Sequence, residues 1–261
     1  MQLEMQNDIL AKYNKGLAYL VGLVKTVLVS DADVKRFQVV QRNASLNITR
    51  HVVLYILNAS TSDPTLIPVA NSEKLRALEL IIGVCILDKK SRTIFRELRG
   101  MESLLSILDQ PIPHPPPSPS PATPPVTANP PPYVLQMACI DALLSVMIDS
   151  RDNQDIFKKQ QGYAKIKKFL VDGEQSKDLR LKALEFVYLT GAQFDEVAND
   201  GGVVDYNKPA SGPTNQQVVS QTLGPKVTDA IFNSKHMALK SQQGRYALVH
   251  AEETLAAIDA L

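Results

Sequence analysis

The fold is decided by a stretch that the chain repeats, LRALELIIGVCILDKKSRTIFRELRGMESLLSILD at residues 75–109. It aligns without a gap to MACIDALLSVMIDSRDNQDIFKKQQGYAKIKKFLV at residues 137–171, at an offset of 62. Apolar residues recur every three or four positions in both copies, which is the spacing of one helix face. Outside those runs, the second copy repeats the Phe–Gly pair Phe95 and Gly100. Such matches indicate an internal repeat rather than two unrelated amphipathic helices.

A third copy begins at Leu181, where LKALEF repeats the LRALEL of residues 75–80. It lies 44 residues after the second copy, whereas the first two copies are 40 apart once the 22 residues of 111–132 are removed. Armadillo and HEAT repeats have periods of roughly 40–47 residues. One such unit cannot bury its apolar face alone, so neighbours stack. We therefore expect an all-α, armadillo- or HEAT-like solenoid of about three to four repeats with a Pro-rich loop insertion.

The same patterns predict three parts of the chain. Residues 1–190 are expected to form the armadillo-like helical domain, with a disordered Pro-rich insertion at 111–132. The repeat pattern fails from Gly191 onward, and the Gly- and Pro-containing stretch 191–225 is typical of a flexible linker. Residues 226–261 are expected to form a C-terminal helical segment.

Charge and hydropathy narrow the class of partner. Lys and Arg number 28 against 27 Asp and Glu, a net charge of +1, which argues against a nucleic-acid or anionic-membrane binder. The longest apolar stretch, 17–29, is interrupted by Lys25 and is shorter than the roughly 20 residues of a membrane-spanning helix. We expect no nucleic-acid partner, no membrane partner and a cytoplasmic location.

The Pro-rich insertion holds 12 of the 17 prolines and no charged residue between 111 and 132. It is expected to be a solvated loop, and a passive spacer is one interpretation of it. A ligand for proline-binding domains is a weaker interpretation, because no Arg or Lys flanks its Pro-x-x-Pro motifs. Three hydroxyl residues precede prolines and are candidates for phosphorylation, which would charge the loop strongly: Ser118, Ser120 and Thr123.

Motifs of known chemistry are missing from the sequence. It has no phosphate-binding or dinucleotide-binding glycine motif, and no His-x-x-x-His or Cys-x-x-Cys pair. Cys85 and Cys139 fall on repeat helices, where the other copy has Met147 and Ala77, so they are expected to be core thiols. We predict no enzyme activity, no catalytic residues, no cofactor and no metal. An enzyme with an unrecognised site is the alternative.

A basic run is the remaining candidate site. In solenoids the last helix of each repeat tends to line the concave face, where cations would meet an acidic partner segment. The alternative is an ordinary solvated helix face. The run consists of Lys158, Lys159, Lys165, Lys167 and Lys168.

Part of the second copy resembles a known family. The run DSRDNQDIF at 149–157, followed by Gly162, is similar to a segment of the fungal septation-initiation-network family called cell division control protein 14. That family is an armadillo-like scaffold and is unrelated to the phosphatase of the same name. The helix from Leu181 to Tyr188 and the N-terminal Phe37-Gln38 also resemble it, and the resemblance covers about 37–190.

This resemblance implies a non-catalytic partner of a germinal-centre-type protein kinase. The complex would act at the spindle pole body in septation and cytokinesis, where a rigid solenoid promotes the localisation and activity of the kinase. A general armadillo-type adaptor for an extended peptide is the alternative. It would have a ladder of Asn and aromatic residues on successive last helices, which 100–108 and 162–170 lack. The oligomeric state is left open.

Overall fold

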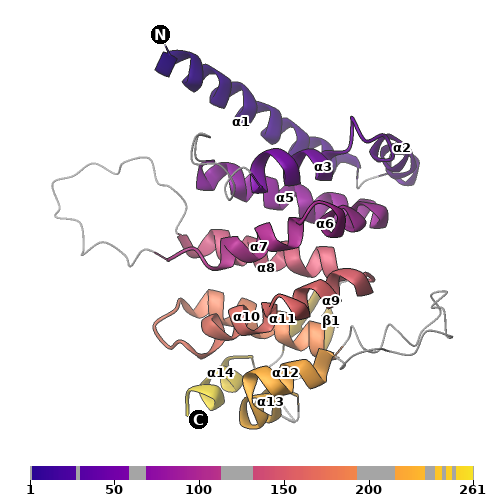
Figure 1. The fold of residues 1–261 in the computed structure, drawn as a ribbon. Helices are drawn as coiled ribbons and strands as arrows, with labels where there is room; N and C mark the ends of the chain where they lie inside the picture. The colour runs from indigo at the N-terminus through magenta and orange to yellow at the C-terminus, as the bar shows by residue number, and fades with distance from the viewer. Residues whose placement is uncertain are drawn as a thin grey trace. The chain divides into compact units, whose positions relative to one another are not determined.

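The computed structural model describes most of the chain (Figure 1), namely residues 2–27, 30–58, 69–112, 132–192, 215–232, 239–242, 245–248 and 251–260. The chain divides into two compact units, Met1–Asn153 and Gln154–Leu261. Ser118, Ser120 and Thr123 lie outside the described residues, so their phosphorylation stays a prediction.

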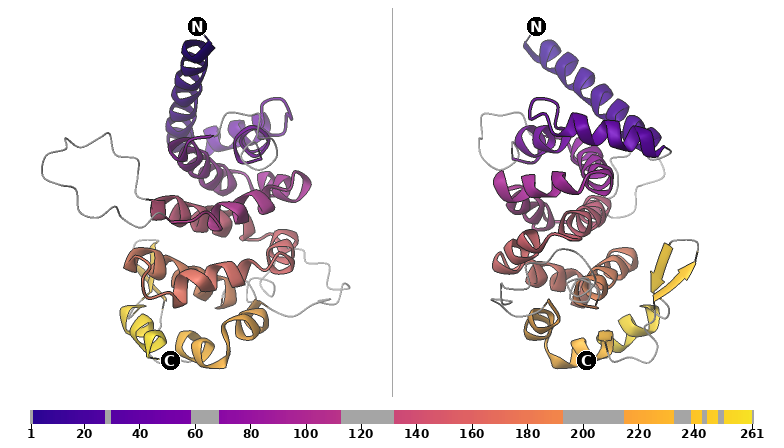
Figure 2. Two further views of the ribbon diagram at one scale, coloured as in Figure 1. Left: turned by 60° about the vertical axis from the view of Figure 1, so that its left-hand side comes forward. Right: turned by 90° about the vertical axis from the view of Figure 1, so that its right-hand side faces the viewer.

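The all-α fold class is confirmed. Apart from two short strands, the regular elements of the described residues are helices, and within each unit they pack on one another as in an α-solenoid (Figures 1 and 2). In the part of the chain that the structure describes, no helix is both long and apolar enough to cross a membrane.

Among the described residues, four helical elements precede the first copy of the repeat. They are α1 (Gln2–Val27), α2 (Asp31–Gln41), α3 (Ile48–Val52) and one π-helical turn, η1 (Val53–Leu57). Side-chain caps fix where two of them begin, because Ser30 and Asn47 each accept a hydrogen bond from a backbone N–H of the first turn. The caps separate α2 and α3 sharply from the residues before them.

The two aligned copies fold into the same succession of helices. The first consists of α5 (Asn71–Leu87), the 3-10 turn η2 (Lys89–Arg92), α6 (Thr93–Glu97) and α7 (Gly100–Leu108). The second consists of α8 (Pro132–Met147), α9 (Arg151–Lys159) and α10 (Gly162–Val171). The gapless alignment therefore matches helices to helices and turns to turns.

The turn before the last helix is the most exact part of the repeat. Arg99 and Gln161, which are 62 positions apart, both have a φ of 57°. Each precedes a glycine that lies against a buried ring: a Cβ on Gly100 would be 2.7 Å from Phe95, and a Cβ on Gly162 would be 2.2 Å from Phe157. The matched Phe and Gly of the sequence are thus one packing motif used twice.

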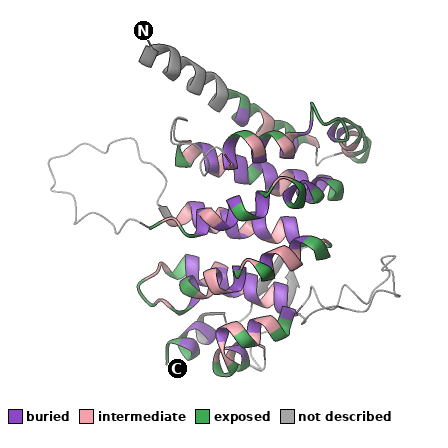
Figure 3. Ribbon diagram, in the orientation of Figure 1, coloured by how far each residue is buried: buried purple, intermediate pink, exposed green. Residues whose placement is uncertain are grey.

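The core of the first unit lies between α5 and the helices on either side of it. α5 packs against α1 and α8, and Figure 3 shows many buried residues along α5 and α8. Cys85 and Cys139 are fully buried there, as the sequence predicted. Cys139 donates a weak hydrogen bond from Sγ to the Leu104 carbonyl oxygen at 3.1 Å.

The second unit is built around α11 (Lys177–Ala192), which packs against α10 and three later helices. Those helices and a small hairpin follow in the order α12 (Asn215–Leu223), α13 (Pro225–Phe232), β1 (Leu239–Gln242), β2 (Arg245–Leu248) and α14 (Ala251–Asp259). The strands are antiparallel, with Leu239 opposite Leu248.

Two stretches of this unit differ from the expectation. α12 lies within 191–225, where a linker was predicted; it is a packed helix because Val219 and Leu223 are buried against its neighbours. The segment 226–261 was predicted to be helical, but a hairpin separates its two helices. The strands have the sequences LKSQ and RYAL, in which apolar and polar residues do not alternate, so the pattern that predicts a strand is absent.

Candidate protein-interaction sites

The predicted lysine run lies on two helices of the second unit. Lys158 and Lys159 belong to α9, and the other three lysines belong to α10. The Lys158 ammonium is 2.9 Å from the Asp155 carboxylate on the same helix. Lys159 is exposed. One cation of this pair is therefore balanced within its own helix.

Lys167 has an internal role. Its ammonium donates a hydrogen bond of 2.8 Å to the Thr222 carbonyl oxygen in the last turn of α12. Cations near a helix C-terminus satisfy carbonyls that have no partner within the helix. Lys165 and Lys168 on the same helix also have partners, and Lys168 is exposed. The run includes structural contacts as well as exposed charge, and its role in partner binding stays a prediction.

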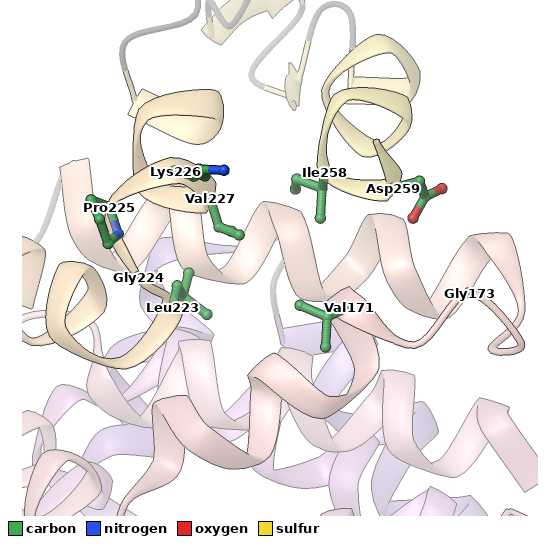
Figure 4. A pocket seen from close by; sticks show the side chains of 9 residues that line it. All are labelled: Val171, Gly173, Leu223, Gly224, Pro225, Lys226, Val227, Ile258 and Asp259. Atoms are coloured by element: carbon green, nitrogen blue, oxygen red, sulfur yellow. The ribbon is translucent and has the colours of Figure 1, made fainter. Parts of the chain in front are cut away.

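A hollow in the second unit is the clearest candidate site (Figure 4). It has a volume of about 760 Å³ and lies between the end of α10, the junction of α12 and α13, and the last turn of α14. Its apolar walls come from all of these elements. The side chains that form them are Val171, Leu223, Pro225, Val227 and Ile258.

The junction of α12 and α13 opens this hollow at Gly224. Gly224 has a φ of 90°, a conformation that residues with a Cβ rarely adopt, and it lets Pro225 begin α13 directly after α12 ends. The Gly224 carbonyl oxygen accepts from both N–H and Oγ1 of Thr228, at 3.1 and 2.8 Å. These two bonds fix the first turn of α13 to the junction.

Opposite charges flank the apolar walls on different helices. Lys226 of α13 is exposed, and Asp259 of α14 is held by the guanidinium of Arg180, whose Nη1 donates to it at 3.0 Å. Hydrogen bonding from Arg180 lowers the pKa of Asp259 below its ordinary value. Arg180 is itself buried and donates from Nε to the Leu170 carbonyl oxygen at 3.2 Å. One buried arginine thus fixes α14 against the ends of α10 and α11.

This arrangement suits an apolar side chain of a protein partner. Val171, at the mouth, is 44% exposed although it is a large aliphatic residue. Covering such a surface is favourable by about 25 cal/mol per Å² of apolar area. Among the described residues, no three His, Cys, Asp or Glu side chains are grouped so as to hold a metal ion.

The start of the run that carries the family resemblance has a different role, because residues 149–153 belong to a joint within the first unit. Arg92 of the first copy donates from Nε and Nη2 to the Cys85 carbonyl oxygen, at 3.1 and 2.9 Å. Its Nη1 donates to the Ile148 carbonyl oxygen at the end of α8, at 2.6 Å. Asn153, fully buried, donates in return to the Arg92 and Val146 carbonyl oxygens, at 2.8 and 3.0 Å. These residues hold the copies together rather than face a partner.

Neither thiol has the environment of a nucleophile. Burial raises the pKa of Cys85 to about 12, with the nearby Arg92 charge opposing this. Burial also raises the pKa of Cys139. Because the thiolate is the reactive form, both thiols are held in the inert state.

The family model described as "Cell division control protein 14, SIN component" matches residues 21–249, which span both units. No curated protein and no solved structure matches the chain.

Proposed function

The chain belongs to the cell division control protein 14 family, a component of the septation initiation network in cell division, and on that premise we propose that it is a non-catalytic scaffold. It binds a germinal-centre-type protein kinase and promotes the localisation and activity of that kinase in septation and cytokinesis. The kinase complex is recruited from the cytoplasm to the spindle pole body.

The family match over residues 21–249 carries this proposal. The family is the network component and not the phosphatase that shares its name. The hollow lined by Val171 supports the scaffold proposal, because it offers an apolar pocket. Protein interfaces depend on a few apolar anchor side chains that fill such pockets. In this proposal the lysine run contributes exposed charge from Lys159 and Lys168 to partner binding.

Quantitative affinity purification from dividing cells tests the proposal. Three versions of the full chain are compared: wild type, Val171→Asp in the hollow, and Ala256→Asp, which changes an exposed α14 residue outside it. We expect one protein kinase in near-equal amount with wild type and Ala256→Asp, and at least about tenfold less with Val171→Asp, because a buried charge without a partner is unfavourable. Recovery of many unrelated proteins without a kinase would favour the general adaptor instead.

Phosphorylation of the Pro-rich stretch would add cell-cycle control to the scaffold. Phosphates on Ser118, Ser120 and Thr123 would introduce charge into a segment that has none. A triple Ala variant should lose its mitotic mobility shift and alter the timing of septation. A variant that behaves as wild type in both assays would remove this part of the proposal.

A further inference from the structure

Equivalent positions of the two copies expose an isoleucine at the end of their first helix. Ile86 is 58% exposed at the end of α5, and Ile148 is 43% exposed just after α8. The residues beside them, such as Leu87 and Met147, are buried. Single exposed aliphatic residues are common on protein surfaces. Here the exposure recurs at matched positions of both copies, which is typical of an interaction surface.

Hydrogen bonds show that these two helix ends lie at one edge of the first unit. The guanidinium of Arg92 reaches both, because it donates to the carbonyl oxygens of Cys85 and Ile148. The turns after the two helices are also joined, since the Lys89 ammonium is 2.8 Å from the Asp149 carboxylate. Ile86 and Ile148 therefore belong to the same edge.

α2 extends this edge. The Gln38 side chain donates from Nε2 to the Leu87 carbonyl oxygen at 2.7 Å, which fixes α2 beside the end of α5. The next two residues of α2, Val39 and Val40, are 62% and 46% exposed. Val39 shares a side of α2 with Lys35 and Arg42, four and three positions away, whereas Val40 lies about 200° around the helix from Gln38. We call Val39, Ile86 and Ile148 the apolar edge.

Unbalanced positive charge accompanies the apolar edge. Lys35 and Arg42 on α2 and Lys90 after α5 are exposed, and none makes an ion pair within the described residues. Most acids nearby are already engaged: Asp149 pairs with Lys89, Asp33 pairs with Arg36, and Asp88 accepts hydrogen bonds from the Lys90 N–H and the Ser91 hydroxyl. Asp31, at the start of α2, is the exposed exception. The field at this edge favours an acidic ligand.

We propose that the apolar edge binds an amphipathic segment of a partner protein in which aliphatic side chains are flanked by Asp or Glu. Aliphatic groups would cover the two isoleucines and Val39, and the acidic groups would pair with Lys35, Arg42 and Lys90. A second copy of this chain docked edge to edge would bring these cations against themselves. A membrane surface fits less well, because the edge has none of the Trp and Tyr residues that anchor proteins at bilayer interfaces.

This edge lies in the first unit, and the hollow beside Val171 lies in the second, so the edge gives the scaffold a binding surface of its own. The inference does not require the partner to be the kinase. The identity of the bound protein tests the proposed function, and the composition of the bound segment tests the present inference.

Site-specific photo-cross-linking is the test. The full chain carries p-benzoylphenylalanine at 86, at 148 or, as a control, in place of Tyr55, which is 63% exposed on η1 and outside the edge. We expect positions 86 and 148 to cross-link the same partner segment, rich in Asp or Glu, and position 55 not to do so. Triple reversal of Lys35, Arg42 and Lys90 to Glu should lower these yields at least about fivefold, because charge complementarity governs encounter.

Other results would overturn the inference. They are a cross-linked segment without acidic residues, a second copy of this chain, or yields at 86 and 148 no higher than at 55. Flotation of the purified chain with phosphatidylcholine–phosphatidylserine vesicles tests the membrane alternative. If the chain binds these vesicles and the triple reversal abolishes that binding, the apolar edge binds lipid instead of a protein segment. Because the reversed residues are exposed, the melting temperature should move by less than about 3 °C, which separates lost binding from lost folding.

Discussion

The two copies of the repeat share the contacts that form within each copy. They differ in the contacts that each copy makes with helices outside it. Both place a left-handed residue, Arg99 or Gln161, before a glycine that lies on a phenylalanine ring. At the joint, position 92 is an arginine that donates to carbonyls of α5 and α8, whereas the matched Gln154 accepts one hydrogen bond of 3.3 Å from Asn215 at the start of α12. Packing within a copy is conserved between copies, and the contacts outward are specific to each.

Truncating the side chain at position 92 or at the matched position 154 should produce the largest difference between the copies in the free energy of unfolding. Arg92→Ala leaves two buried carbonyl oxygens without their charged donor, so we expect the free energy of unfolding to fall by about 3 kcal/mol. Gln154→Ala removes the neutral hydrogen bond from Asn215 and no charged donor, and it should cost about 1 kcal/mol. Urea denaturation of both variants, followed by circular dichroism, measures this. Equal losses would mean that the two joints are equivalent.

Filling the glycine of each copy should have a smaller and more similar effect. Ala at Gly162 would press on three atoms of the Phe157 ring within 2.4 Å, and Ala at Gly100 would meet Phe95 at 2.7 Å. Overpacking of this kind costs roughly 1–3 kcal/mol, and we expect Gly162→Ala at the upper end because Phe157 is enclosed by other aromatic rings.

Two controls sharpen the glycine prediction. Gly173→Ala should change the free energy of unfolding by less than about 0.5 kcal/mol, because nothing lies within 4 Å of the added Cβ. Adding Phe157→Leu to Gly162→Ala should recover part of the loss, which a double-mutant cycle detects. A strictly additive double variant would contradict the ring contact as the cause.

The repeat was predictable because its packing residues carry a pattern. Phe and Gly recur at the offset of the apolar residues, and they recur because the ring and the glycine must touch. The joint was not predictable, since Arg92 binds a backbone carbonyl 56 residues away and any residue supplies a carbonyl. Sequence also left the role of Lys167 open, because its partner is likewise a carbonyl, that of Thr222.

The hollow was missed for a related reason. It needs α12, which lies in a stretch whose glycines and prolines indicated a linker, and Gly224 and Pro225 prove to be the turn that shapes it. The apolar edge was hidden too, because Ile86 and Ile148 fit the helical spacing of core residues and only the structure shows them exposed. In each case a surface depends on how helices meet.

The smallest effect concerns the ion pair between the turns of the two copies. Hydrogen bonding from Lys89, helped by the charge of Arg92, lowers the pKa of Asp149 below its ordinary value. A lowered folded-state pKa gives stability that is fully present above the unfolded value of about 3.9 and disappears as the pH falls through the folded value.

Asp149→Asn removes the ion pairs of Asp149 with Lys89 and Arg92 and keeps the positive φ of 51°, which Asn tolerates. Because Asp149 and Lys89 are solvent-exposed, the free energy of unfolding of wild type should exceed that of the variant by only about 0.5 kcal/mol at pH 7. The difference should shrink toward zero as the pH falls through the lowered pKa of Asp149. Denaturation at a series of pH values measures the difference. A difference that stays constant from pH 7 to pH 2.5 would show that the charge of Asp149 is not its source.

Reconstitution with the kinase is the most direct measurement of the scaffold account. The purified full chain is mixed with the kinase that co-purifies from dividing cells, and gel filtration and phosphate transfer to a protein substrate are followed together. The account predicts one stable complex in which the kinase is more active than alone, with Val171→Asp failing to form it and Ala256→Asp forming it normally. Separate elution of the two proteins with unchanged kinase activity would contradict it.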